Sequence, residues 1–145
     1  MASSTPSQDF VALIRFALVE DSATAALVDD RVRGPFAPRS GEEVREDLFP
    51  MIVVDRIGGS AVAGGHLQRA IVHVYTYSRN SQGEAYRVWD TIAPVLRSAR
   101  LQRSGVSASG WMRQSEEPRS GWNPALSAWY VRTTHMVMMT GLTPP

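Results

Sequence analysis

The chain of 145 residues contains no cysteine, which excludes disulfide bonds, thiolate catalysis and cysteine-ligated zinc. It also contains no lysine, because all 15 basic residues are arginine, whose guanidinium favours forked hydrogen bonds. No apolar run is long enough to span a membrane, and residues 1–7 are polar, unlike a secretion signal. These absences predict a protein made and used in a reducing cytoplasm, or in a particle assembled there.

Net charge is also nearly absent. The formal charge is +1, so the chain has no bulk field that would concentrate it on nucleic acid or anionic lipid. The charges are unevenly divided, with ten acids and six arginines in residues 1–57 and four acids and nine arginines in residues 58–145. Copies of the chain could attract each other head to tail, as in a ring, or folding could mix the charges evenly over the surface. Both interpretations stay open at the level of sequence.

The length predicts one domain over residues 1–145, with flexible ends at residues 1–5 and 142–145. A chain of this size buries about two-thirds of its unfolded surface and needs no covalent staple.

The clearest strand and the clearest helix lie between residues 67 and 101. Leu67–Tyr77 is rich in β-branched and aromatic residues and predicts a central strand. Ser81 and Glu84 have the spacing of a capping box, which predicts the start of a helix. Pro94 interrupts the helical pattern and predicts a kink or an early end near residues 91–93. The apolar stripe of this helix comprises Ala85, Val88, Trp89, Ile92, Leu96 and Ala99.

Weaker patterns predict the remaining elements. A second capping box at residues 5–8 begins a helix to about residue 20, and Ser22 caps a short helix that ends at residues 29–30. A brief extended segment follows at residues 31–33. Further strands are predicted over 51–57, 106–113 and 127–140.

Three stretches are predicted to be loops. Residues 34–49 lose the apolar periodicity, and loops of that length are usually functional or disordered. Gly58–Gly65 has four glycines but no phosphate-binding motif, which predicts a flexible hairpin loop. Residues 114–125 are polar around Trp122, whose ring is either folded back on the core or offered to another chain.

The order of elements is helix, helix, strand, strand, helix, strand, strand. It predicts an α+β fold in which a mainly antiparallel four-stranded sheet packs with helices.

The sequence offers no recognisable reactive centre. His66 lies at a loop end, whereas His73 and His135 lie on two strands and could approach each other on one face if those strands pair. No metal-ligand spacing and no G-x-S-x-G motif accompany them. We predict no catalytic residue, no metal site and no cofactor.

Four segments then resemble a known family. Residues 25–32 read AALVDDRV, residues 48–54 read LFPMIVV, and residues 72–79 read VHVYTYSR. In this order they resemble the segments "aaLvggRVy", "lPyivv" and "v.v.vws." of the phage tail terminator family, also described as tail completion or head-to-tail joining proteins. The helix over residues 85–96 is similar to the next pattern of that family, "a..i.d.i...L". The chain departs from the family at Arg33, where a tyrosine is usual, and over residues 114–125.

The resemblance implies a structural virion protein and not an enzyme. It implies a ring of six copies that caps the finished tail tube and docks it to the neck of the filled head. Its partners would be further copies of itself, the tail tube protein and a neck or connector protein. Double-stranded DNA would pass through the bore without sequence readout, and no membrane would be bound. The location would be the junction of tail and neck in the virion, after assembly in the host cytoplasm.

Two sets of residues are candidate interfaces under this interpretation. The neighbour set, expected to contact adjacent subunits or the neck, comprises Glu42, Glu43, Arg45, Glu46, Asp47, Gly58, Gly59, Gly64, Gly65 and His66. The tube set comprises Arg113, Glu116, Glu117, Arg119 and Trp122. Two other classes stay open, namely a neck stopper, connector ring or tail tube subunit and, more distantly, a small hydrolase or metal-dependent enzyme.

Overall fold

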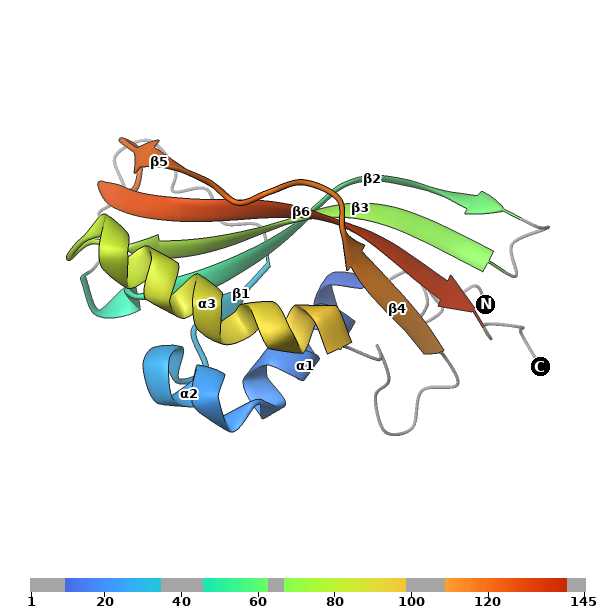
Figure 1. Ribbon diagram of the computed structural model, residues 1–145, viewed down its shortest axis with the longest axis horizontal. Helices are drawn as coiled ribbons and strands as arrows, with labels where there is room; N and C mark the ends of the chain where they lie inside the picture. Colours follow the sequence, from blue (N-terminus) through green and yellow to red (C-terminus); the bar gives the residue numbers. More distant parts are fainter. Residues whose placement is uncertain (1–9, 35–45, 63–66, 99–108, 141–145) are drawn as a thin grey trace, which may run out of the picture.

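The central strand predicted from the sequence lies in the middle of a twisted sheet in the computed structural model of the protein. The structure describes residues 10–34, 46–62, 67–98 and 109–140. Its elements are α1 (Phe10–Glu20), α2 (Ser22–Val28), β1 (Val32–Arg33), the 3-10 turn η2 (Glu46–Leu48), β2 (Met51–Val62), β3 (Leu67–Ser78), α3 (Gln82–Ser98), β4 (Ser109–Gln114), β5 (Arg119–Asn123) and β6 (Ala128–Thr140). Figure 1 shows the sheet above a layer that holds all three helices.

The sheet has the strand order β1-β2-β3-β6-β4, and β5 pairs with β6 beside β4. The predicted α+β class agrees with this arrangement, but the predicted four-stranded sheet is wrong. The sheet has six strands and is mixed, because β1 runs parallel to β2 while the other pairs are antiparallel. The extended segment expected at residues 31–33 is the extra edge strand β1.

The strand β5 was missed because it carries no apolar alternation. It lies within the stretch predicted to be a polar loop, and its residues are exposed or half-buried. Main-chain pairing to β6 makes it a strand, from Arg119 opposite Arg132 to Asn123 opposite Ala128.

The glycine-rich stretch was also misassigned. The strand β2 does not stop at Ile57 but continues through Gly58 and Gly59 to Val62, paired with β3 throughout. A bulge between Arg56 and Gly58 shifts the register, and glycine suits a bulge or a close backbone approach. The part of the predicted loop at residues 63–66 lies outside the described residues.

The helix α3 begins as predicted but ends later. The Ser81 hydroxyl accepts the Glu84 amide at 3.0 Å, as an N-cap does. The second half of the capping box is not formed, because the Glu84 carboxylate accepts the Ser78 hydroxyl at 2.6 Å instead. The early end at Pro94 is wrong, since the helix runs on to Ser98. Pro94 lies on the exposed side, where water can satisfy the carbonyl group that the proline leaves unpaired.

The first helix ends at Glu20, as predicted, and its predicted capping box at residues 5–8 lies outside the described residues. The cap of α2 is Asp21 and not Ser22. The Asp21 carboxylate accepts both the amide and the hydroxyl of Thr24, at 2.9 and 2.6 Å.

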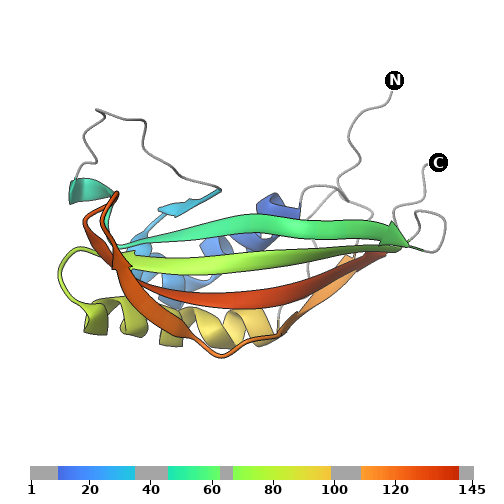
Figure 2. The same ribbon diagram turned by 90° about the horizontal axis from the view of Figure 1, so that it is seen from above.

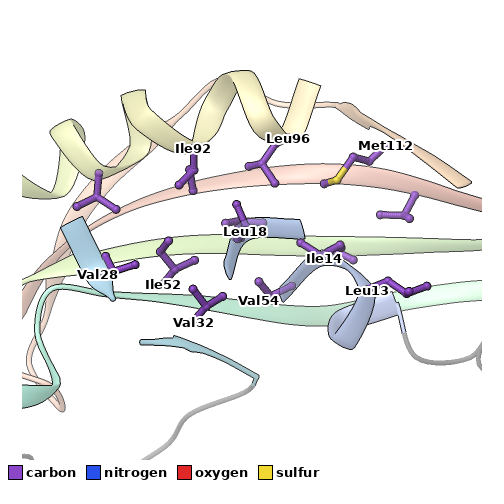
Figure 3. Close-up of a cluster of buried hydrophobic side chains, with 14 of the residues drawn as sticks. Leu13, Ile14, Leu18, Val28, Val32, Ile52, Val54, Ile92, Leu96 and Met112 are labelled. Carbon is purple, nitrogen blue, oxygen red and sulfur yellow. The ribbon is translucent and has the colours of Figure 1, made fainter. Parts of the chain in front are cut away.

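The main core fills the space between the helices and one face of the sheet. Figure 3 shows side chains from α1, α3 and β2 pointing toward one another across this space. The buried cluster comprises Leu13, Ile14, Leu18, Val28, Val32, Ile52, Val54, Ala70, Val72, Val74, Val88, Ile92, Leu96, Met112 and Val137. The apolar stripe predicted for α3 thus contributes to the core, with Trp89 half-buried beside it.

Within the described residues, no α-helix covers the other side of the sheet, which we call the open face. Figure 2 looks down on this face, and the helices lie behind the strands. A smaller cluster covers one end of it, with Met51, Val53, Tyr77, Leu126 and Ala128 buried and Phe49 packed against them. The rest of the open face presents side chains of β2, β3, β6 and β4.

Candidate functional site

The middle of the open face carries its polar and aromatic side chains. Strand register places Asp55 opposite His73, and His73 opposite Thr134, so all three share that face. The Tyr75 hydroxyl lies 3.4 Å from Nδ1 of His73. The ring of Tyr75 also stacks on Tyr77, with 5.5 Å between centroids. The result is an aromatic row beside one histidine.

Burial lowers the pKa of His73 below its ordinary value of 6.5, and the positive charge of Arg132 acts in the same direction. The carboxylates of Asp55 and Glu116 oppose the shift without cancelling it. His73 is therefore a neutral imidazole at neutral pH.

His135 lies on the other face of the sheet, in the core. Its register partner is Val72, one residue away from His73, and successive residues of a strand point to opposite faces. The predicted approach of His73 and His135 on one face is therefore wrong, although their strands do pair. A one-residue offset in register separates them.

A short hydrogen-bonded chain surrounds His135. Its Nε2 lies 2.7 Å from the Thr133 hydroxyl, which also accepts the indole N–H of Trp89 at 3.3 Å. Nδ1 of His135 is buried with no hydrogen-bond partner. Burial lowers the pKa of His135 to about 4, so the ring is neutral and acts as a core residue.

Among the described residues, neither His73 nor His135 belongs to a group that could hold a metal ion. Within the residues that the structure describes, no three His, Asp or Glu side chains gather closely enough to hold a metal ion. The same residues contain no helix long and apolar enough to cross a membrane.

The tube set is gathered along one edge of the sheet. Arg113 is an exposed residue of β4, Glu116 and Glu117 are exposed in the turn that follows, and Arg119 begins β5. Arg119 and Glu116 form an ion pair at 3.9 Å with both side chains largely in solvent, which contributes little to stability.

Trp122 completes this edge and is 47% exposed. It meets Trp129 edge to face at 4.9 Å, so the ring is anchored on one side and open to solvent on the other. The ring is thus partly folded back onto the sheet, and a contact with another chain stays a prediction.

The neighbour set is less fully described. Gly58 and Gly59 lie in β2, at the opposite edge of the sheet from the tube set. Asp47 is exposed in η2, and Glu46 begins that turn. The other members, Glu42, Glu43, Arg45, Gly64, Gly65 and His66, lie outside the described residues. The structure thus separates Gly58 and Gly59 from the tube set by the width of the sheet, and the role of each set stays a prediction.

One hollow of about 420 Å³ lies between the outer side of α1 and β1. Its charged lining consists of Arg15 and Asp30, and Nε of Arg15 already donates to the carbonyl of Val32 at 3.0 Å. One charged side chain of each sign, with the arginine already hydrogen-bonded, is too little to predict a ligand.

Sequence reasoning missed the full length of β2 and the whole of β5. It expected loops at the glycine-rich and polar stretches, where the structure has the strands β2 and β5. The available signal was the charged residues Arg113 and Arg119 near the ends of β4 and β5, since charged side chains are typical of an exposed sheet edge.

The complete arrangement is similar to a chain in the solved virion of a native gene transfer agent particle. The likeness covers 96% of this chain and 100% of that chain, with a TM-score of 0.56 and 15% sequence identity. The two chains share a fold. The sequence itself matches no family model, and it matches no curated protein.

Proposed function

We propose that this protein is a structural component of a virion, and that its copies form a ring that terminates a tail tube and joins it to the head. The observation that carries the proposal is the fold shared over the whole length of a chain in a gene transfer agent virion. The order of the segments at residues 25–32, 48–54 and 72–79, which resembles the tail terminator family, adds support independently of the fold.

The placement of the candidate interfaces suits a ring. A ring subunit that also binds a tail tube needs one surface for its neighbours and another for the tube. The described neighbour residues Gly58 and Gly59 lie at one edge of the sheet, and the tube set lies at the other. In the proposed ring of six copies, the partners are the same chain, a tail tube protein and a neck protein. DNA passes through the bore without being read.

The proposal assigns no reaction to the chain. His73 and His135, the titratable pair on which a metal-dependent enzyme would depend, are separated by the sheet itself. A structural role uses instead the rigidity of long paired strands and the exposed residues along their edges.

The proposal is tested by locating the protein in an assembled particle. A copy with a C-terminal peptide tag, labelled with gold and imaged by electron microscopy, should appear at the junction of head and tail. Label along the tail would instead support a tube subunit, and label confined to the capsid or the tail tip would contradict the proposal.

A second assay separates a terminator from a neck stopper. The purified protein is incubated with free tails and, separately, with tailless heads, and each mixture is sedimented. A terminator should sediment with free tails, whereas a stopper should sediment with the heads.

A further inference from the structure

The strand β2 has a long edge without a strand partner. Its inner edge pairs with β3 from Met51 to Val62, but β1 pairs with its outer edge only at Ile52 and Val53. From Val54 to Val62, no strand among the described residues pairs with the outer edge. An edge of this length presents backbone N–H and C=O groups to solvent and is a template for another strand.

The strand β4 forms the other edge of the sheet. It pairs with β6 on one side, and on the other side no strand in the described ranges pairs with it. The Ser115 amide donates to the Thr134 carbonyl at 2.8 Å. This bond shows that the odd-numbered residues of β4 direct their backbone N–H and C=O groups toward β6. Residues at even positions of β4 therefore point their backbone groups away from β6. Gly110, Met112 and Gln114 each offer an outward donor and an outward acceptor.

The two free edges lie at the same level of the sheet. Arg113 of β4 lies opposite Met136, Met136 opposite Ile71, and Ile71 opposite Gly58 of β2. Figure 2 shows β4 and the far part of β2 toward the same end of the molecule, on opposite sides of the sheet, with β1 at the other end of β2. A second copy placed beside the first, in the plane of the sheet, would thus bring its β2 edge next to the β4 edge of the first copy.

The strand directions also fit. Each step from β2 through β3 and β6 to β4 reverses direction, so β4 runs antiparallel to β2. If neighbouring copies are related by rotation about an axis parallel to the strands, β4 of one copy stays antiparallel to β2 of the next. The open faces of all copies then lie on the same side of the continued sheet. The contact is heterologous and can close into a ring.

Charge at the seam is complementary. Asp55 lies on the open face of β2, and Arg113 lies on the open face of β4 by the same register that buries Met112 on the helix side. Across an edge-to-edge seam these opposite charges would become cross-strand neighbours. Ile57, at the bulge of β2, is 50% exposed and adds apolar surface to the same seam.

We propose that copies of this chain join by pairing the outer edge of β4 in one copy with the outer edge of β2, beyond Arg56, in the next. The sheet then continues from subunit to subunit. Main-chain hydrogen bonds provide the attraction. Arg113 faces Gly58 at this level, and Asp55, the next open-face residue along β2, attracts Arg113 diagonally across the seam. This joint rests on the proposed ring, and it moves Arg113 from the tube surface to the surface between subunits.

Engineered disulfides test the joint directly, because the natural chain has no cysteine to interfere. Arg113→Cys is combined in turn with Asp55→Cys, Ile57→Cys and Gly58→Cys, and each purified double variant is oxidised. Within one chain the two strands are three spacings of about 4.8 Å apart, which is beyond the reach of a disulfide. Any bond must therefore join two copies. A ladder of covalent oligomers on a denaturing gel is expected for at least one pair, and the control pair Arg113→Cys with Arg87→Cys should stay monomeric.

The charge pair has its own test. Asp55→Arg and Arg113→Asp should each weaken self-association several-fold in light scattering, and the double variant should restore it. If neither the ladder nor the rescue appears, the edge pairing is wrong, whether the sample is a ring or a monomer. If the protein forms a ring but no cross-links appear, the edge pairing is wrong and the proposed function is unaffected. The proposed function is tested separately, by the position of the gold label in assembled particles.

Discussion

The neutral, buried state of His135 makes this residue a site of acid sensitivity. Its pKa in the folded state is about 4, against an ordinary value of 6.5. Between these values the unfolded chain binds a proton that the folded chain does not bind, so the free energy of unfolding rises with pH. The stabilisation is complete above pH 6.5 and is lost as the pH falls toward 4.

We therefore expect the free energy of unfolding to fall by about 2 kcal/mol between pH 7 and pH 5, from this residue alone. Urea titrations at the two pH values measure it. His135→Gln should remove most of the difference. His73, whose pKa is lowered in the same direction, should account for less because it is only half-buried. His73→Gln is thus the control, and an unchanged slope in His135→Gln would contradict the assignment.

At the scale of the element, strong periodicity was sufficient for prediction. The strands β3 and β6 and the helix α3 carry long apolar patterns, and the sequence located all three. The strand β5, which is formed mainly by main-chain pairing, was missed because it buries little. The two residues of β1 were expected to be extended, but not to pair in the sheet. The glycines of β2 suggested a loop because glycine has no side chain, so they show no apolar alternation from which a strand could be predicted.

Gly59 shows why the far part of β2 contains glycine. Its φ of 149° is disfavoured for other residues, and an added Cβ would lie 2.4 Å from the Arg69 carbonyl oxygen. Gly59→Ala should lower the free energy of unfolding by about 1–3 kcal/mol. Gly58→Ala is the matched control, because a Cβ there approaches only Ile71, at 4.0 Å. Chemical denaturation should show the control within about 0.5 kcal/mol of the natural chain. Equal losses would disprove the close approach.

The start of α2 gives a second matched pair. Asp21→Ala removes the acceptor of two hydrogen bonds from Thr24 and should cost about 1 kcal/mol of stability. Ser22→Ala changes an exposed first helical residue and should cost little. Thermal unfolding of the two variants distinguishes them, and a larger loss in Ser22→Ala would show that the sequence interpretation was correct.

At the scale of the whole molecule, the sequence predicted the α+β class of the fold but not the arrangement of its strands in space. Face assignments depend on register between strands that are distant in sequence. The separation of His73 from His135 is one example. The residue types along each strand do not show which residues of the neighbouring strand they pair with. The position of Arg113 and Gly58 at opposite edges is another.

Trp122 links this arrangement to the proposed function. Trp122→Ala removes an exposed ring and its contact with Trp129, so we expect a loss of stability of only about 1 kcal/mol. Sedimentation with free tails should fall at least tenfold, as expected for a central aromatic contact. Tyr86→Ala, which removes another exposed aromatic side chain on α3, should leave sedimentation unchanged. Full tail binding by Trp122→Ala would remove Trp122 from the tube surface.

The insertion of β6 between β3 and β4 also governs the order of events during synthesis (Figure 1). Ser78 pairs with Trp129 and Leu67 with Thr140, so the middle of the sheet closes only after the ribosome has made residues far downstream. Until β6 has been made, the edge of β3 that pairs with β6 has no partner, and β4 has no strand to pair with. Under the edge pairing proposed above, a subunit would therefore present β4 to a neighbour only after its own β6 has been made.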